Sequence, residues 1–392
     1  MHENNLPGQI QLSDPDAIAH SDRLQTLICE QIQKQGPMPF HQYMAQALYA
    51  PGLGYYTAGS QKFGNAGDFV TAPEISFLFS QALANQCAQV LSVQTGDILE
   101  FGAGSGVMAA HILKHLMSLG KLPGRYLILD LSPDLQQRQR QTIEAIVPEF
   151  IDRVEWLQAL PENFSGVILA NEVLDAMPVS VFRKRSGSVE EQFVNVNDDG
   201  MQLIWQQASA ALLEAVAQLE QRYGEFADGY MSEINLNLQG WLSSIGEMLH
   251  TGVVILIDYG YNGFEYYHPE RYMGTLICHY QHRAHDDPMI LPGLQDITAN
   301  VDFSAVANAA RQSGLALAGY TPQANFLLSC GIEQLIADYI DTDEKKFLQL
   351  SQAMKVLMLP SEMGERFKVL ALSKNFNQAL IGFAMRDLSG RL

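Results

Sequence analysis

Residues 98–111 read ILEFGAGSGVMAAH, and this stretch decides which kind of fold the chain can form. A short apolar run at 98–101 is followed by Gly102, Gly104 and Gly106 and then by a helical pattern. Such a run is typical of a strand that is buried on both faces. Glycine permits positive φ and lets another group come close to the backbone. The stretch therefore predicts a strand, a glycine turn and a helix, with a ligand lying over the turn.

The identity of that ligand depends on the glycine spacing and on Glu100. The third glycine falls one residue early for the dinucleotide fingerprint G-x-G-x-x-G, and no Lys-Ser or Lys-Thr follows, which excludes a Walker A loop. A carboxylate two residues before the first glycine would repel a pyrophosphate and would attract an ammonium or a sulfonium group. S-adenosylmethionine has both groups, and the helix N-terminus after Gly106 offers N–H groups to its carboxylate. Two alternatives stay open at this point, an NAD-type cofactor and a glycine turn that only packs a strand against a helix.

A second acidic residue, Asp130, ends the next apolar run in LILDLSP. A carboxylate at this position can accept hydrogen bonds from both ribose hydroxyls of an adenosine. Leu131 and Ser132 follow it directly, and Asn171 ends the fourth predicted strand on the same sheet edge. We expect all of these residues to bind the cofactor together with Glu100 and the three glycines.

Apolar runs alternate with helical patterns along most of the chain, which predicts an α/β fold with a doubly wound, mostly parallel, seven-stranded sheet. The runs read as strands are 97–101, 126–131, 153–157, 165–172, 252–260, 315–320, 367–374 and 380–387. Residues 1–20 predict a flexible arm, 21–92 an N-terminal helical segment with a glycine-rich lid loop, and 93–392 the core. Pro73 is expected to begin a helix that runs to about Val90. Three insertions interrupt the core: a β-hairpin within 183–235, a long loop at 260–300 and added helices at 322–365.

Composition limits the class of protein. The 392 residues are 47% hydrophobic and carry a formal net charge of −19, which indicates a globular chain and disfavours nucleic acid as a partner. The four cysteines form no CxxC pair, so we expect reduced thiols and a cytoplasmic location. The N-terminus lacks the apolar segment of a signal peptide, and no run approaches 18 apolar residues, so we expect no membrane insertion. The apolar helices at 322–365 would allow a homodimer.

The segment ANEVLDAMPV, which begins at Ala170, supplies candidate catalytic residues at the carboxyl edge of the sheet. Glu172 and Asp175 are three residues apart and would share one face of a helix. Carboxylates can bind a guanidinium through two hydrogen bonds, orient it and take its proton as a new bond forms. The structural alternative is that Glu172 is a charge at a helix N-terminus and Asp175 a solvated side chain.

Further candidates for the acceptor side lie near the ends of later strands. Asp258 and Tyr259 end the fifth predicted strand and would form walls of the acceptor pocket, although Asp258 is equally suited to a turn before Gly260. His279 belongs to CHYQHRAHDD, where histidines recur every three residues. Methyl transfer from a sulfonium needs no metal, so we expect no metal site and assign His279 to an acceptor-binding loop.

Seven motifs give the chain a family resemblance from about residue 24 to residue 385: FGNAGDFVTAPEIS, ILEFGAGSG, LILDLSP, ANEVLDAMPV, GTLICHYQHRAHDDP, DITANVDF and MGERFKVLA. In this order they resemble the MidA-like methyltransferases, a family that includes a mitochondrial assembly factor methylating an arginine of a complex I subunit. The resemblance implies a class I methyltransferase fold, S-adenosylmethionine as cofactor and protein arginine, in a complex I-type subunit, as acceptor. It also favours Gly67 and Asp68 as a lid over the cofactor, while the alternative for Asp68 is a cap of the helix that begins at Pro73. Where the family pattern has histidine before VDF, this chain has Asn300.

Two other functions remain as alternatives. One is an assembly or scaffold protein with a non-catalytic cofactor pocket, and the other is a methyltransferase that acts on a small molecule.

Overall fold

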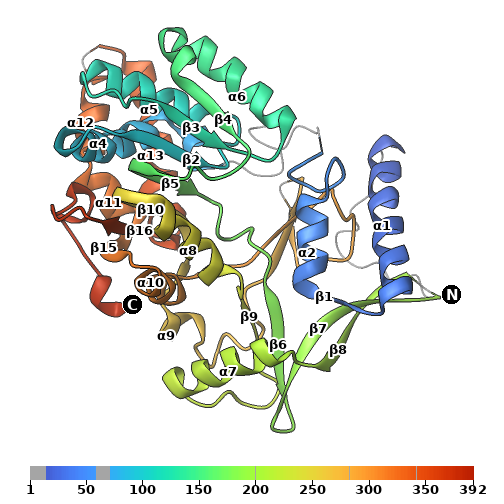
Figure 1. The fold of residues 1–392 in the computed structure, drawn as a ribbon. Coiled ribbons are helices and arrows are strands. Elements are labelled where there is room, and N and C mark those ends of the chain that lie inside the picture. Colours follow the sequence, from blue (N-terminus) through green and yellow to red (C-terminus); the bar gives the residue numbers. More distant parts are fainter. Residues whose placement is uncertain (1–14, 59–70, 199, 282, 341) are drawn as a thin grey trace.

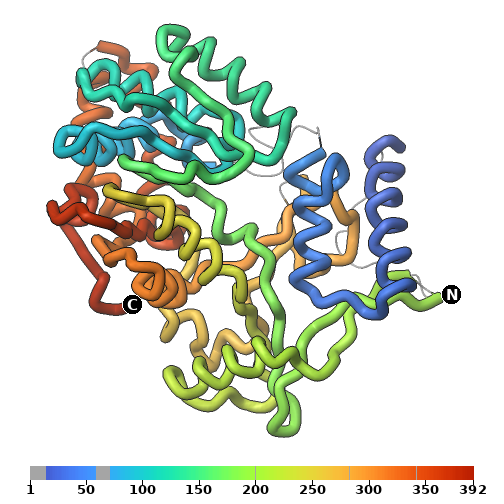
Figure 2. The backbone as a smooth tube through the Cα atoms, viewed as in Figure 1, coloured from blue at the N-terminus to red at the C-terminus, as the bar shows by residue number. Residues whose placement is uncertain are grey.

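The computed structural model describes residues 15–58, 71–198, 200–281, 283–340 and 342–392, so the predicted lid residues Gly67 and Asp68 lie outside the described part. The chain forms two lobes (Figure 1). The core lobe contains a large sheet with helices on both faces. The second lobe combines two N-terminal helices with a smaller sheet that the middle of the chain contributes, as the backbone trace in Figure 2 shows.

The central sheet confirms the predicted seven-stranded, mostly parallel arrangement. Its order is β15-β16-β10-β5-β2-β3-β4, with a short strand β14 beside β10, and only β16 runs antiparallel to its neighbours. The strands are β2 (Asp97–Phe101), β3 (Tyr126–Leu129), β4 (Val154–Leu157), β5 (Phe164–Asn171), β10 (Leu249–Tyr261), β14 (Val301–Asp302), β15 (Ala316–Pro322) and β16 (Phe367–Lys374). The chain order reverses between β2 and β5, and ligands of open α/β sheets bind at such a reversal.

The strand predicted at 380–387 is wrong. Its residues form a short 3-10 helix, η2 (Ile381–Phe383), because the side chains of another helix satisfy its backbone. The N–H groups of Ile381 and Gly382 donate to the side-chain oxygens of Gln89 and Gln86, at 3.0 and 2.9 Å. These donors are therefore not available to a sheet.

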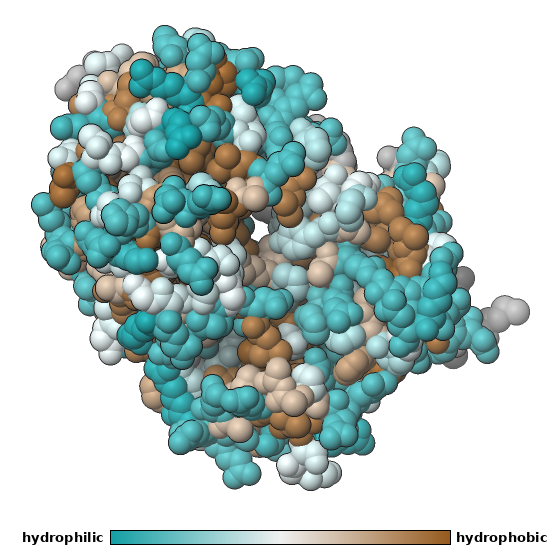
Figure 3. All heavy atoms as spheres, in the orientation of Figure 1, coloured by the Kyte–Doolittle hydropathy of each residue, from teal (hydrophilic) through white to brown (hydrophobic). Residues whose placement is uncertain are grey.

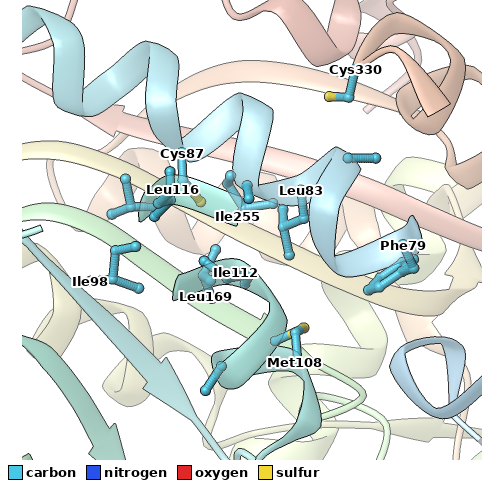
Figure 4. Packing of buried hydrophobic residues seen from close by; sticks show 14 of the residues in the cluster. Phe79, Leu83, Cys87, Ile98, Met108, Ile112, Leu116, Leu169, Ile255 and Cys330 are labelled. Atoms are coloured by element: carbon cyan, nitrogen blue, oxygen red, sulfur yellow. The ribbon is translucent and has the colours of Figure 1, made fainter. Parts of the chain in front are cut away.

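Helices cover both faces of the central sheet, so alternate residues of each strand are buried on opposite sides. On one face Ile98, Leu169 and Ile255 pack beneath two helices, whose contacting side chains are labelled in Figure 4. That face carries α4 (Phe77–Val93), α5 (Val107–Ser118), α11 (Gln323–Ser329), α12 (Ile332–Ala337) and α13 (Glu344–Met358). The opposite face is packed by α8 (Leu238–Met248) and α10 (Phe303–Gln312), and α6 (Pro133–Ile146) contacts α5 at the β4 end.

The helix predicted from Pro73 to about Val90 is two helices, α3 (Ala72–Ile75) and α4. Ser76 separates them in an extended conformation with φ −158°, and its hydroxyl accepts a hydrogen bond from the N–H of Leu78 at 3.2 Å. Serine at this position caps the second helix, which explains the break.

The first N-terminal helix begins earlier than expected. The arm predicted at 1–20 is wrong for residues 15–20, because α1 spans Pro15–Gln35, and α2 follows at Phe40–Tyr49. Buried apolar side chains of α1, including Leu24, Ile28 and Ile32, belong to the core of the second lobe. The ordered helix is thus held by tertiary packing, which the polar sequence of its first turn does not reveal.

The two middle insertions form ordered structure. The predicted hairpin at 183–235 is confirmed, but it belongs to a five-stranded antiparallel sheet made of β1 (Met38–Pro39), β6 (Ser180–Arg185), β7 (Ser188–Asn197), β8 (Gly200–Gln207) and β9 (Met231–Ile234). Helix α7 (Ala210–Tyr223) follows the hairpin. The long loop expected at 260–300 is wrong in part, since it contains α9 (Gly263–Tyr266) and a small antiparallel sheet of β11 (Ile277–Tyr280), β12 (Arg283–His285) and β13 (Asp296–Thr298). The added helices at 322–365 are confirmed as α11, α12, α13 and α14 (Met363–Arg366).

All four cysteines are free, in line with the reduced thiols that the sequence predicts. In the described ranges, no helix combines the length and the apolar character that crossing a membrane requires.

The packing in Figure 4 generates a stability test on α5. Ile112 is fully buried, whereas Met117 on the same helix is 38% exposed. We expect Ile112→Ala to lower the free energy of unfolding by about 2–5 kcal/mol, because it removes buried methyl groups and leaves a cavity. Met117→Ala should change it by less than about 1 kcal/mol. Urea denaturation followed by circular dichroism measures both, and equal losses would contradict the packing described.

Candidate active site

A cavity of about 370 Å³ lies at the carboxyl ends of β2, β3 and β5, where the core lobe meets the second lobe. Figure 3 shows an opening between the two lobes near the centre of the view, with hydrophobic residues at its rim. Of the residues predicted from sequence, the cavity is lined by Glu100, Gly102, Gly104, Asp130, Leu131, Ser132, Asn171, Glu172 and Asp175. The fold therefore brings most of the predicted cofactor residues together with both predicted catalytic carboxylates.

The charge of the cavity wall has one sign. Six carboxylates line it, and no Lys, Arg or His stands among the described residues that do so. The six are Glu74, Glu100, Asp130, Glu172, Asp175 and Asp296. A pyrophosphate would meet repulsion on several sides, whereas a cation would be attracted. The cavity thus favours positively charged groups.

The glycine turn adopts the backbone that its sequence predicts. Gly102 and Gly104 have φ of +61° and +53°, a region that residues with a Cβ rarely occupy. At Gly102 an added Cβ would lie 3.7 Å from the nearest atom, in Val173, so the turn leaves open space beside it. These two glycines line the cavity and let a ligand approach the backbone.

Gly106 has a different role. It is the N-cap of α5 with φ +85°, and it is absent from the cavity wall. A Cβ at this position would lie 2.7 Å from the Cα of Gln139 on α6. The structure therefore places Gly106 at a close contact between helices, and its contact with the cofactor stays a prediction.

Gln139 was not singled out from the sequence, yet it joins three parts of the site. Its amide Nε2 donates to the carbonyl oxygen of Gly104 at 3.1 Å and to Asp130 Oδ2 at 2.7 Å. Its Oε1 accepts a hydrogen bond from the indole N–H of Trp156 at 2.8 Å. Because the side chain is fully buried with every hydrogen atom of its amide used, it fixes the glycine turn relative to Asp130.

Asp130 ends β3 as expected and is oriented from both sides. Its Oδ1 accepts the N–H of Ser132 at 2.9 Å, while Oδ2 accepts from Gln139. Ser132 then caps α6 through a hydrogen bond from the N–H of Leu135 at 3.4 Å. Each carboxylate oxygen has a second lone pair, so the group can still accept ribose hydroxyls.

Glu100 is 1% exposed, and its Oε2 accepts a hydrogen bond from the hydroxyl of Tyr126 at 2.6 Å. Burial, with a contribution from the charge of Asp130, raises the pKa of Glu100 to about 7. A nearby cation would favour the ionised form and lower this pKa. Glu100 is thus suited to a positively charged group at the glycine turn.

Asn171 ends β5, and Glu172, the next residue, has a strained backbone conformation. Glu172 has φ +53°, and its N–H donates to the carbonyl oxygen of Ile257 on β10 at 2.9 Å. The side-chain amide of Asn171 donates to Glu172 Oε1 at 3.1 Å, and within the described residues its own Oδ1 is buried without a partner. Burial first, and then the charge of Asp175, raises the pKa of Glu172 to about 8. Strain of this kind is common at functional sites, where surrounding contacts hold it.

Asp175 is 6% exposed and directs one carboxylate oxygen, Oδ1, to a buried position with no hydrogen-bond partner among the described residues. Burial raises the pKa of Asp175 to about 6, while a hydrogen bond from Tyr259 opposes this shift. The predicted helical face shared by Glu172 and Asp175 does not form, since the residues after β5 make a turn. Both carboxylates nevertheless line the same cavity, and neither is a solvated surface group.

The structure places Asp258 and Tyr259 behind the cavity wall. Asp258 is fully buried, and its Oδ2 accepts the N–H groups of Leu174 and Asp175 at 3.0 and 3.2 Å. Tyr259 is likewise absent from the residues that line the cavity. Strand β10, which carries Asp258, thus positions the turn after β5 and does not form a wall of the cavity.

Two further acidic residues in the wall were not foreseen. Glu74, in α3, accepts a hydrogen bond from the hydroxyl of Ser105 in the glycine turn. Asp296, at the start of β13, accepts one from the hydroxyl of Tyr56 at 2.9 Å. Glu74 belongs to the motif TAPEIS and Asp296 to DITANVDF, so both fall within the quoted family motifs, but no local pattern marks either as part of a site.

His279 and Asn300 lie elsewhere. His279 sits on β11 opposite Asp296 in the strand pairing and is absent from the cavity wall. Asn300 lies between β13 and β14, where its N–H donates to the hydroxyl of Thr275 at 3.0 Å, and it lines a separate cavity of about 50 Å³. In the ranges that the structure describes, no three His, Cys, Asp or Glu side chains are grouped to hold a metal ion.

These residues fit S-adenosylmethionine, the ligand that the sequence predicts. The glycine turn and Glu100 suit its amino acid part, and Asp130 suits its ribose. An apolar wall that includes Phe101 and Trp241, whose rings pack at 5.4 Å and 64°, suits a flat purine. Two buried oxygens without partners, Asn171 Oδ1 and Asp175 Oδ1, remain to accept donors from a ligand.

Comparisons with known proteins agree with this assignment. Residues 82–321 match the model of a family described as "Putative S-adenosyl-L-methionine-dependent methyltransferase". A Burkholderia thailandensis protein, solved with bound S-adenosyl-homocysteine, is 43% identical, with a TM-score of 0.94 over 98% of this chain and 100% of that one. The Mus musculus protein arginine methyltransferase NDUFAF7, mitochondrial, is 29% identical over 87% of this chain and 82% of its own length. The Drosophila melanogaster NDUFAF7 homolog, also named mitochondrial, is 28% identical with the same coverage.

The contact at Gly106 generates a prediction that separates packing from ligand binding. Gly106→Ala should destabilise the protein by about 1–3 kcal/mol more than Gly120→Ala, because only the former pushes a Cβ into the backbone of α6. Gly120 is a matched control, since it has φ +65° and open space around it. Thermal unfolding without ligand measures the difference. Equal stability of the two variants would contradict a packing role.

The raised pKa of Glu172 predicts how stability depends on pH without ligand. A folded-state pKa of about 8, against an ordinary value of 4.5, means that the folded protein holds this proton more tightly. Its contribution to stability is present at low pH and is lost as pH rises towards 8, at up to about 1.4 kcal/mol per pH unit. Glu172→Gln should therefore flatten the fall in stability between pH 5.5 and 7.5. The exposed control Glu144→Gln should follow the wild type, and parallel curves for all three proteins would refute the assignment.

Proposed function

Because the chain belongs to the family of S-adenosyl-L-methionine-dependent methyltransferases, we propose that it methylates an arginine side chain of a protein. The observation that supports this acceptor is the acidic wall beside the glycine turn, where Glu172, Asp175 and Asp296 lie together and no described residue of the wall carries a positive charge. The two relatives named above, which carry the name protein arginine methyltransferase, add to the argument.

The acceptor chemistry requires a way to bind and deprotonate a guanidinium. Its pKa is above 12, so its nitrogens are poor nucleophiles until charge is moved away from the reacting one. When bound, S-adenosylmethionine supplies an electrophilic methyl group on a sulfonium sulfur. Glu172 and Asp175 would accept hydrogen bonds from the guanidinium, orient it and hold positive charge on the nitrogens that do not react.

Glu172 is the better candidate to receive the proton that the acceptor loses. Burial keeps its pKa near 8 without a cation, and a bound guanidinium would ionise it. As the new carbon–nitrogen bond forms, the acceptor nitrogen becomes acidic and its proton can pass to a carboxylate. The backbone N–H that Asp175 donates to Asp258 keeps Asp175 in place during this step.

Three narrower statements are part of the proposal. The acceptor is a subunit of a complex I-type assembly, as the family resemblance implies. The protein acts in the cytoplasm, although the curated relatives named above are designated mitochondrial. It forms a homodimer through the added helices, in which Leu348 is 58% exposed and Leu359 46%.

The test is methyl transfer from labelled S-adenosylmethionine to proteins of a complex I preparation, with mass spectrometry of the modified residue. We expect methylarginine with the wild type and a rate about 10²–10⁴-fold lower with Glu172→Gln or Asp175→Asn. Glu144→Gln, which exchanges an exposed carboxylate on α6, should retain full activity.

Other outcomes identify the alternatives. Binding of S-adenosyl-homocysteine without transfer to any protein or metabolite would favour a scaffold with a non-catalytic pocket. Transfer to small amines in a metabolite extract, with no protein labelled, would favour a small-molecule methyltransferase. Full arginine methylation by both carboxylate variants would refute the assigned catalytic roles.

A further inference from the structure

The second lobe contributes two tyrosines and a carboxylate to the far end of the cavity. Tyr49 ends α2 and Tyr56 follows it by seven residues, while Asp296 comes from the small β13 sheet. All three line the cavity together with Asp175. None of these three residues belongs to the cofactor-binding elements of the core sheet, so their presence in the wall requires another explanation.

The tyrosines are fixed in place. The N–H of Tyr56 donates to the carbonyl oxygen of Leu48 at 2.8 Å, so the chain after α2 folds back on the end of that helix. The rings of Tyr49 and Tyr56 stack with centroids 5.6 Å apart and an interplanar angle of 21°. The Tyr49 hydroxyl donates to the carbonyl oxygen of Ala176 at 3.0 Å, which ties this pair to the turn that carries Asp175.

The two carboxylates of this region are both buried and differ in their partners. Tyr56 donates to Asp296 Oδ1 at 2.9 Å. Asp296 is 3% exposed and Asp175 6%. Within the described residues Asp175 Oδ1 has no partner, although it is buried and belongs to the cavity wall. A buried acceptor of this kind costs free energy unless a ligand supplies a donor.

We propose that Tyr56, Asp296 and Asp175 form a recognition site for a planar guanidinium, and that this site selects arginine over lysine. The inference deepens the proposed arginine methylation and rests on it for the nature of the acceptor. Its basis is the combination of a stacked tyrosine pair, two carboxylates from different lobes and one unpaired buried oxygen.

Shape and donor count explain the selectivity. A guanidinium is flat, presents five N–H donors in a fork and stacks on aromatic rings. Carboxylates on different elements can therefore each receive a donor, while a tyrosine ring contacts the face of the cation. A lysine ammonium is compact and strongly hydrated, and it could not reach both carboxylates and replace its water equally well.

The experiment measures binding rather than methyl transfer. N-acetyl-arginine amide and N-acetyl-lysine amide are titrated by ligand-observed NMR into the full chain saturated with S-adenosyl-homocysteine. For the wild type we expect at least about tenfold tighter binding of the arginine probe. Tyr56→Phe, which removes one hydroxyl and keeps the ring, and Asp296→Asn should each weaken arginine binding about tenfold and change lysine binding much less. The affinity for S-adenosyl-homocysteine should stay within twofold.

One control variant tests whether the effect is specific to the site, and a double variant tests whether its two residues act together. Tyr272→Phe alters a tyrosine that is 56% exposed and outside the cavity wall, and it should leave both probes unaffected. The double variant Tyr56→Phe/Asp296→Asn should lose little more than either single variant, because one hydrogen bond joins the two residues.

Several results would overturn the inference. These are equal binding of the two probes by the wild type, an unchanged arginine preference in both variants, or loss of S-adenosyl-homocysteine binding together with arginine binding, which would make the residues structural. Failure of the proposed function looks different. A protein that methylates no arginine yet binds the arginine probe through Tyr56 would refute the proposed activity and leave this site standing. Arginine methylation with both variants indistinguishable from wild type in probe binding would refute this site alone.

Discussion

The hydrogen bonds that Asp258 accepts from the N–H groups of Leu174 and Asp175 are the constraint on which the active site depends. They bind the turn after β5 to the end of the neighbouring strand β10, from a position with no solvent exposure. That turn carries Asn171, Glu172 and Asp175 to the cavity and holds Glu172 at a positive φ. An unpaired backbone N–H group or an unpaired carboxylate would cost free energy at this buried position. The two N–H groups and the Asp258 carboxylate therefore satisfy one another.

Collecting carboxylates without a cation has an electrostatic consequence. Burial raises the pKa of Glu100, Glu172 and Asp175 to about 7, 8 and 6, so part of the site holds protons near neutral pH when no ligand is present. A ligand with ammonium and sulfonium groups, or a guanidinium, would return these groups to their ionised forms. Part of the binding free energy of such a cation is therefore used to release these protons. The ionised carboxylates also repel anionic ligands.

The sequence predicted the parts of the fold and site that depend on local pattern. Apolar runs located the seven strands of the central sheet, and the predicted residues Gly102, Gly104, Glu100 and Asp130 do line one cavity, because strand ends of a parallel sheet meet at one edge. It could not predict Gln139, a polar residue on an amphipathic helix with no motif around it, nor the pairing of Tyr56 with Asp296 across 240 residues. It could not reveal that Gly106 also packs closely against α6, because a glycine needed for helix contact and one needed for ligand contact look the same. The strand expected at 380–387 failed because its backbone partners are the side chains of Gln86 and Gln89, which no periodicity reveals.

The two ends of the cavity differ in how far the sequence alone reveals them. The cofactor end is built by consecutive strand–turn–helix units of one sheet, so a short stretch of sequence contains most of its chemistry. The other end, where we propose that the acceptor binds, is assembled from α2, the turn after β5 and β13, which only the complete fold brings together. Many functions can use the same sheet, because what it acts on is decided by the elements added around it. For this chain the added second lobe closes one side of the cavity with aromatic and acidic side chains, and the nature of the acceptor should therefore be sought in that lobe rather than in the glycine turn.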